Sequence, residues 1–97
     1  MPTRISETPK QFLGVQAFDE TDLETVRALT LPPGTNYILM QAQNNFVIWH
    51  PGGDTPAEGN GFAAAPGETV CIFQDNSADV RVIRGAAGAT LFVAYYR

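Results

Sequence analysis

The chain has 97 residues, of which 44% are hydrophobic and 16% are charged, and its formal net charge at pH 7 is -4. This length supports one domain with a modest core, and the apolar fraction argues against disorder. No Lys or Arg lies between Arg27 and Arg81. A nucleic-acid reader or a protein bound to an anionic membrane needs clustered cations, so we expect neither partner.

The N-terminal residues 1–11 are polar, contain Pro2 and Pro9, and are expected to form an extended arm. Residues 12–97 are expected to form a single domain. The first residues lack the apolar stretch of a signal peptide, and no apolar run is long enough to cross a bilayer, which indicates synthesis in a cytoplasm. The arm residues that are candidates for contacting a partner are Thr3, Arg4, Ile5 and Lys10.

The first elements of the domain alternate between apolar and acidic segments. Residues 12–18 are apolar, are interrupted by Gly14, and are predicted as the first strand. The acidic stretch 19–22 suits the start of one helical turn, because Asp and Thr are favoured caps. Residues 23–31 fit a helical period by their apolar positions and a strand by their β-branched content. We favour a strand there, because the Pro-Pro-Gly sequence at 32–34 stops it abruptly.

Six further segments are rich in β-branched and aromatic residues, as strands are. They are residues 37–43, 46–50, 62–65, 69–74, 80–84 and 90–96, and turn residues separate them at 32–34, 44–45, 51–54, 66–67, 75–77 and 85–88. A Pro-Gly turn precedes an apolar strand twice, at 31–35 and at 65–69. This spacing predicts an all-β fold, a small antiparallel β-sandwich with about seven to eight short strands in a jelly-roll-like arrangement.

Several predicted strands are apolar on both faces, whereas a half-buried strand alternates apolar and polar residues. A two-sheet sandwich buries one face of each sheet, so the second face needs a cover. Either loops and the arm supply it, or another subunit or partner does. The small core and the low charged fraction favour the second explanation. The candidate interface residues are Phe46, Trp49, Tyr37, Phe92 and Tyr96.

Residue types that carry catalysis are sparse. The chain has one histidine, His50, one cysteine, Cys71, and two serines that lie outside any nucleophile motif. A single cysteine excludes an intramolecular disulfide, and Cys71 lies in the apolar run 70–73, where we expect a buried thiol that packs as a small hydrophobe. We therefore expect no enzymatic activity and no cofactor.

Two weaker alternatives concern polar loops. Metal ligands are available in His50, Asp54 and Glu58 and in the acidic stretch 19–24, but neither set has the spacing of a dedicated metal site, so we expect none. A lectin-like site needs an aromatic platform with polar neighbours, and Trp49, His50, Asp54 and Asn60 are candidates for one. This alternative stays open from the sequence.

Six stretches follow one another over about two thirds of the chain. They are Leu31-Pro32-Pro33-Gly34-Thr35, the strand 37–42, Val47-Ile48-Trp49, Gly53-Asp54-Thr55-Pro56, Val80-Arg81-Val82-Ile83-Arg84 and the ending at 89–96. In this order of turns and strands the chain resembles small virion proteins of tailed bacteriophages.

That resemblance implies a capsid decoration or cement protein. Such a protein binds the major capsid protein on the outer surface of the assembled head, often as a homotrimer, and stabilises contacts between capsomers. The alternative that the resemblance leaves open is a tail or receptor-binding accessory module with lectin-like carbohydrate binding. No catalytic residue is part of the resemblance.

Overall fold

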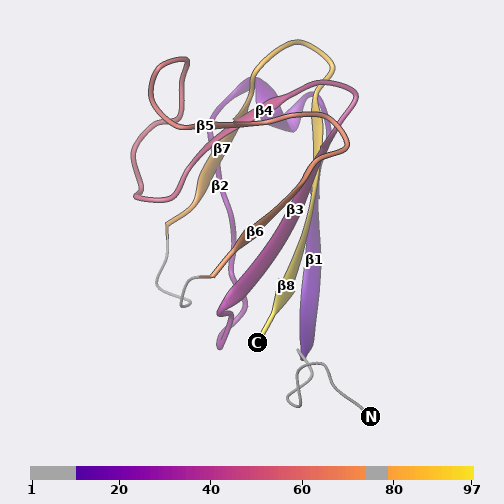
Figure 1. Cartoon of the computed structure of the whole chain (residues 1–97), viewed down its shortest axis with the longest axis vertical. Helices are drawn as coiled ribbons and strands as arrows, with labels where there is room; N and C mark the ends of the chain where they lie inside the picture. The colour runs from indigo at the N-terminus through magenta and orange to yellow at the C-terminus, as the bar shows by residue number, and fades with distance from the viewer. Residues whose placement is uncertain (1–10, 74–78) are drawn as a thin grey trace.

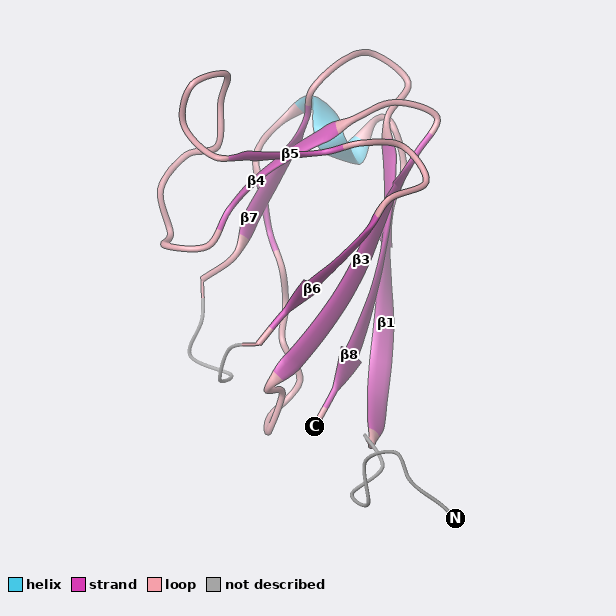
Figure 2. Ribbon diagram, viewed as in Figure 1, coloured by secondary structure: helices cyan, strands magenta, loops and turns pink. Residues whose placement is uncertain are grey.

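The computed structural model describes residues 11–73 and 79–97, and this part of the chain contains eight strands and one short 3-10 helix (Figure 1; Figure 2). In chain order they are β1 (Phe12–Phe18), η1 (Asp22–Glu24), β2 (Arg27–Ala28), β3 (Tyr37–Gln43), β4 (Val47–His50), β5 (Phe62–Ala64), β6 (Thr69–Ile72), β7 (Arg81–Arg84) and β8 (Thr90–Tyr96). The predicted all-β class is confirmed. The arm candidates Thr3, Arg4, Ile5 and Lys10, Gln74 at the end of a predicted strand, and the predicted turn at 75–77 lie outside the described residues.

The strands form two antiparallel four-stranded sheets, in the orders β1-β8-β3-β6 and β2-β7-β4-β5. In Figure 1 the four strands of the first sheet fan out below, and the shorter strands of the second sheet lie above and to the left. Strand β1 pairs with β8, β2 with β7, β3 with β6 and β4 with β5, as in one long hairpin rolled up on itself. The pairs β3 with β8 and β4 with β7 join these units into sheets. This is the strand order of a jelly roll, as predicted.

The core lies between the two sheets, because each strand turns alternate side chains inward. The inward side chains include Phe18, Ile38, Met40, Val47, Val82, Leu91, Val93 and Tyr95. Burying an aliphatic or aromatic side chain of this kind contributes roughly 1.5–3 kcal/mol relative to leaving it exposed. Leu23 of η1 is also fully buried, so the helical turn closes one end of the core beside β7.

The strand predicted over residues 23–31 is right only in part. Residues 22–24 form the 3-10 turn η1, and the strand β2 is limited to Arg27–Ala28. Two backbone-to-carboxylate bonds hold the approach to this turn: Asp22 N donates to Asp19 Oδ1 at 2.8 Å, and Asp19 N donates to Asp22 Oδ2 at 3.0 Å. The amides of Leu23 and Glu24 donate to the carbonyls of Asp19 and Thr21, each at 3.2 Å, so the first amides of the predicted strand are paired within the turn and β2 starts late.

The two Pro-Gly sequences before β3 and β6 form the same turn, as the repeated pattern predicts. In each, the amide of the fourth residue donates to the carbonyl of the first, at 3.1 Å for Thr35 and 3.0 Å for Glu68. Gly34 and Gly67 occupy the third position with φ of 88° and 85°. A type II turn requires this left-handed conformation, which glycine adopts without steric cost.

Candidate functional site

The described interior of the sandwich contains few polar groups, and those that lie there are hydrogen-bonded. Thr35 is the buried polar residue there, and its Oγ1 donates to the carbonyl of Pro32 at 2.6 Å. The hydroxyl of Tyr95 donates to Gln16 Oε1 at 2.6 Å, and burial raises the pKa of Tyr95 to about 12. The hydroxyls of Thr35 and Tyr95 are thus each engaged with a partner of their own.

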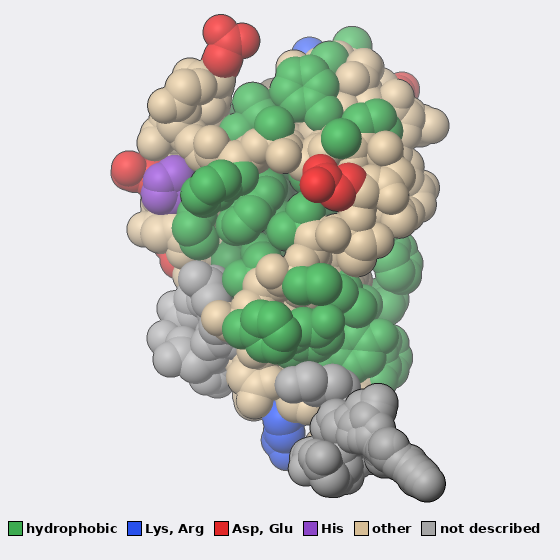
Figure 3. Space-filling model, viewed as in Figure 1, with side chains coloured by type: hydrophobic (Ala, Val, Ile, Leu, Met, Phe, Trp, Pro, Cys, Tyr) green, Lys and Arg blue, Asp and Glu red, His purple; other side chains and the backbone are tan. Residues whose placement is uncertain are grey.

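The outer face of the β1-β8-β3-β6 sheet carries a patch that we call the aromatic face. Residues paired across antiparallel strands lie on the same side of a sheet, and Tyr96 is paired with both Phe12 and Tyr37. By this register the aromatic face comprises Phe12, Val15, Ala17, Thr90, Phe92, Ala94, Tyr96, Tyr37, Leu39, Gln41, Gln43, Thr69 and Cys71, together with Phe73 just beyond β6. Figure 3 shows hydrophobic side chains gathered over these strands in the lower half of the view.

One row of aromatic rings crosses all four strands of the aromatic face. The ring centroids of Phe12 and Tyr96 are 5.7 Å apart, those of Tyr96 and Tyr37 are 5.8 Å apart, and those of Tyr37 and Phe73 are 4.7 Å apart. The rings meet at angles of 64°, 55° and 37°, which are edge-on or tilted contacts. Each such pair contributes roughly 0.5–1.5 kcal/mol beyond area burial. The row is therefore held in place before any partner arrives.

Side chains on the aromatic face are unusually exposed for their type. The exposed fractions are 70% for Phe73, 57% for Phe12, 54% for Val15 and 46% for Phe92. Within the described residues, these are four of the five large hydrophobic side chains that are exposed. Monomeric proteins rarely leave a contiguous apolar surface of this kind uncovered, so the aromatic face is the strongest candidate for an interface.

The aromatic face carries no charged residue among its described members. The ion pairs that the structure places lie around η1 and the second sheet: Arg27–Asp22 at 3.9 Å, Arg81–Asp79 at 3.1 Å and Arg84–Glu24 at 3.9 Å. Polarity on the aromatic face instead comes from amides and hydroxyls at the end away from the aromatic row, where Gln41 Nε2 donates to Gly67 O at 3.2 Å. The surface thus has an apolar end and a neutral polar end.

Cys71 lies on the aromatic face and is exposed, so the expectation of a buried thiol is wrong. Its neighbour Ile72 is the residue that β6 turns inward, which leaves Cys71 pointing outward by alternation. The hydroxyl of Tyr37 donates to Cys71 Sγ at 3.6 Å, and this hydrogen bond raises the pKa of Tyr37. Cys71 is a natural probe of whether the aromatic face is covered.

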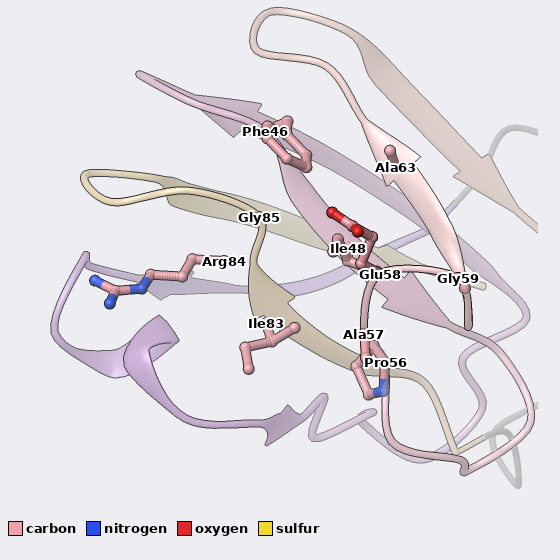
Figure 4. A pocket seen from close by; sticks show the side chains of 11 residues that line it. Phe46, Ile48, Pro56, Ala57, Glu58, Gly59, Ala63, Ile83, Arg84 and Gly85 are labelled. Carbon is pink, nitrogen blue, oxygen red and sulfur yellow. The ribbon is translucent and has the colours of Figure 1, made fainter.

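The outer face of the second sheet is largely covered by its own chain. Phe46, Ile48 and Ile83 are half-buried there, and Pro56, in the loop that folds over them, is fully buried. A hollow of about 350 Å³ remains between this loop and the sheet (Figure 4). The sequence prediction for Phe46 is right about an outer surface, but its ring packs on Gly85, where an added Cβ would collide with it.

Trp49 does not lie on an outer face, so its assignment to the candidate interface is wrong. It shares the inward side of β4 with Val47 and packs against the core, with its ring centroid 5.0 Å from that of Phe62. Both sides of β4 are apolar: Val47 and Trp49 face the core, and Phe46 and Ile48 face outward under the covering loop. The sequence pattern of β4 therefore does not show which side faces inward.

The polar residues proposed for metal or sugar binding do not converge. In the described residues no three His, Cys, Asp or Glu side chains are grouped as a metal site. His50 Nδ1 accepts a hydrogen bond from the amide of Gly52 at 3.0 Å, and Asn60 Nδ2 donates to Thr55 O at 2.8 Å. These local bonds shape the loops rather than a shared pocket.

Sequence reasoning placed Tyr37, Phe92 and Tyr96 together correctly but missed three members of the same surface: Phe12, Val15 and Phe73. A signal was present in β3, where Gln41 and Gln43 alternate with buried Met40 and Ala42. The glutamines mark the outer side of β3, and the residues paired with that side of β3 in β8 and β6 also face outward.

Comparisons with protein-family models, with curated protein sequences and with solved structures find no match. In residues 11–73 and 79–97, no helix has the length and apolar character needed to span a membrane. The fold and the site define a small jelly-roll module with one outer sheet face that is apolar, uncharged and uncovered by its own described residues.

Proposed function

We propose that this protein is a non-enzymatic structural protein that acts by assembly, as a decoration or cement protein on the head of a tailed phage. The observation that carries the proposal is the aromatic face, an ordered apolar surface on a module whose interior offers no reactive group in the described residues. The resemblance of the sequence to small phage virion proteins is the reason for proposing a phage head as the assembly to which the protein binds. Jelly rolls serve many functions, so the fold alone does not carry this step.

The proposed mechanism is stabilisation by binding. A subunit that binds the assembled head and not the separated capsomers shifts the equilibrium toward the assembled state. Apolar surface is the appropriate means, because burying it is favourable without the desolvation cost of charged groups. The major capsid protein is the proposed partner, and the outer surface of the head is the proposed location.

The test is attachment to phage heads that lack the protein. Purified protein is mixed with bare heads, and co-sedimentation and the temperature of head disruption are measured. We expect saturable attachment and a higher disruption temperature. Heads that bind no protein at any concentration reached contradict the proposal.

A matched pair of variants tests the role of the aromatic face in this attachment. Phe12 and Phe62 are 57% and 58% exposed, and each contacts one aromatic ring, but only Phe12 lies on the aromatic face. We expect Phe12→Thr to weaken attachment by about tenfold, the loss usual for a central apolar interface residue, and Phe62→Thr to leave it unchanged. Equal effects of the two variants would remove the aromatic face from the mechanism.

We do not advance the carbohydrate-binding alternative as a second function. Trp49 is turned toward the core, and the polar groups of His50 and Asn60 are engaged in their own loops.

A further inference from the structure

We infer that the occupant of the aromatic face is a second copy of this chain, paired face to face about a two-fold axis. This inference rests on the proposed function in one respect: it takes the aromatic face to be an assembly surface. It adds the identity of the partner at that surface. The paired module, and not the single subunit, would then bind the major capsid protein through its other surfaces, so a variant that weakens pairing also weakens attachment to heads.

The first argument is charge. The aromatic face has no charged member to neutralise a charge on a partner, and a buried charge without a partner is costly. Its complement must therefore be another uncharged surface. A second copy presents such a surface, whereas Arg81, Arg84 and Glu24 surround the opposite side of the molecule.

The second argument is the distribution of polarity. Aromatic rings of Phe12, Tyr96, Tyr37 and Phe73 lie at one end of the face, and neutral polar side chains such as Gln41 and Gln43 lie at the other. A two-fold axis through the apolar end overlaps the two aromatic rows and leaves the polar ends at the periphery. That arrangement has the apolar centre and polar rim of a stable protein interface.

The third argument is area. With about 200 Å² for a fully exposed aromatic side chain, the exposed fractions of Phe73, Phe12 and Phe92 correspond to roughly 350 Å² of surface per copy. Two copies would bury about 700 Å² through these three rings, and the other members of the face add to this area toward the roughly 1,200 Å² at which specific stable interfaces begin. Sheets pack face to face with interdigitating side chains, which is the geometry that a pairing of two such faces requires.

Sedimentation equilibrium of the full chain over a range of concentrations tests the inference. We expect a reversible monomer–dimer equilibrium. Phe12→Thr, in the aromatic row at the apolar end, is expected to weaken dimerisation about tenfold or more, and Phe62→Thr on the other sheet to leave it unchanged. Far-UV circular dichroism confirms that each variant is folded, and Val15→Thr, an isosteric change on the same face, serves if Phe12→Thr is not.

Alkylation of Cys71 supplies a second measurement that does not depend on a variant. Cys71 is the one cysteine of the chain and lies on the aromatic face, so its reaction with iodoacetamide should slow as the dimer forms. The protection and the dimer mass should follow the same concentration dependence.

Each other outcome overturns the inference. A monomer at every concentration removes the second copy, and a monomer with a protected thiol means that the chain covers its own face. A mass of three chains also overturns it, because a two-fold pairing of identical faces closes at two copies. A monomer that attaches to phage heads leaves the proposed function standing, whereas a dimer that does not attach contradicts that function and leaves this inference standing.

Discussion

The two outer faces of the sandwich are both apolar, yet they are covered in different ways. Over the second sheet, the loop that contains Pro56 folds back onto Ile48 and Ile83. Over the first sheet, the described residues place no such loop, and Phe12, Val15 and Phe92 remain about half exposed. Apolar residues on an outer strand face are thus not evidence of an interface by themselves. The evidence is apolar residues that stay exposed where the described residues place no covering loop.

Strand length explains part of this difference. Strands β1, β3 and β8 of the first sheet each have seven residues, whereas the strands of the second sheet have two to four. A short sheet can be covered by one loop, and residues 51–61 between β4 and β5 supply it. A sheet of long strands needs a cover of its own size.

The largest effect is expected from opening the covered face. Gly61 has φ of 139°, and a Cβ there would lie 2.6 Å from the carbonyl oxygen of Trp49. We expect Gly61→Val to lower the free energy of unfolding by about 3 kcal/mol, since backbone strain and a clash with rigid backbone add together. Chemical denaturation measures this value.

Gly59 is the matched control for this prediction. It has φ of 84°, but an added Cβ would meet nothing within 4 Å. Gly59→Ala should therefore cost about 1 kcal/mol, the conformational part alone. Equal costs for Gly59→Ala and Gly61→Val would show that the covering loop does not pack as described.

The next largest effect on stability is expected from Tyr95, which is buried in the core between the two sheets. Burial raises the pKa of Tyr95 from 10.0 to about 12. Between these values the unfolded chain has released the tyrosine proton and the folded chain has not, so the unfolded state binds fewer protons. Stability is therefore complete below pH 10, and about 2 kcal/mol is lost as the pH rises toward 12.

Denaturant unfolding of the wild type and Tyr95→Phe across this pH range isolates the effect from other groups. At neutral pH, Tyr95→Phe should cost about 1 kcal/mol, because the bond to Gln16 is lost. Its stability should then fall less steeply above pH 10 than that of the wild type. Parallel curves would mean that Tyr95 is not buried in its neutral form.

Much of the fold was predictable from local chemistry. Strand-forming runs and their Pro-Gly turns predicted the strands from Tyr37 onward, and the type II turns at Gly34 and Gly67 fix where β3 and β6 begin. The short helix η1 was harder, because its apolar spacing and its β-branched neighbours point in opposite directions. In the structure the amides of Leu23 and Glu24 pair with the carbonyls of Asp19 and Thr21, and the Asp19 and Asp22 carboxylates hold the approach to this turn.

The candidate site was less predictable, since strands that are apolar on both sides do not reveal which side faces inward. In β4 both sides carry apolar residues because a loop covers the outer side, and Trp49 was therefore assigned to the wrong side. In β1 a bulge between Phe12 and Gly14 shifts the register, so Phe12 joins the outer side. A bulge changes which face a side chain occupies without changing the pattern of residues.

The two faces are also expected to differ in what they stabilise: side chains on the covered face stabilise the fold, and side chains on the aromatic face stabilise self-association. Phe46 covers Gly85 on the loop-covered face, so Phe46→Thr should lower the free energy of unfolding by about 1.5 kcal/mol and leave self-association unchanged. Phe12→Thr should do the reverse, with a small change in stability and a large change in association. Thermal denaturation of dilute protein and sedimentation give the two numbers. If Phe46→Thr also weakens association, both faces are interfaces and the contrast between them fails.

The smallest effect concerns Cys71 on the aromatic face, which can be tested by substitution and, separately, by alkylation of its thiol. Cys71→Ser removes one long contact to Tyr37 and should change the free energy of unfolding by less than about 0.5 kcal/mol. In dilute native protein, the thiol should be alkylated at a rate within about a few-fold of that in denaturant, because it is exposed. A buried thiol would react only through opening of the fold and so orders of magnitude more slowly. Fast alkylation in dilute solution shows that the chain leaves this face open, and any protection gained at higher concentration then has to come from another molecule.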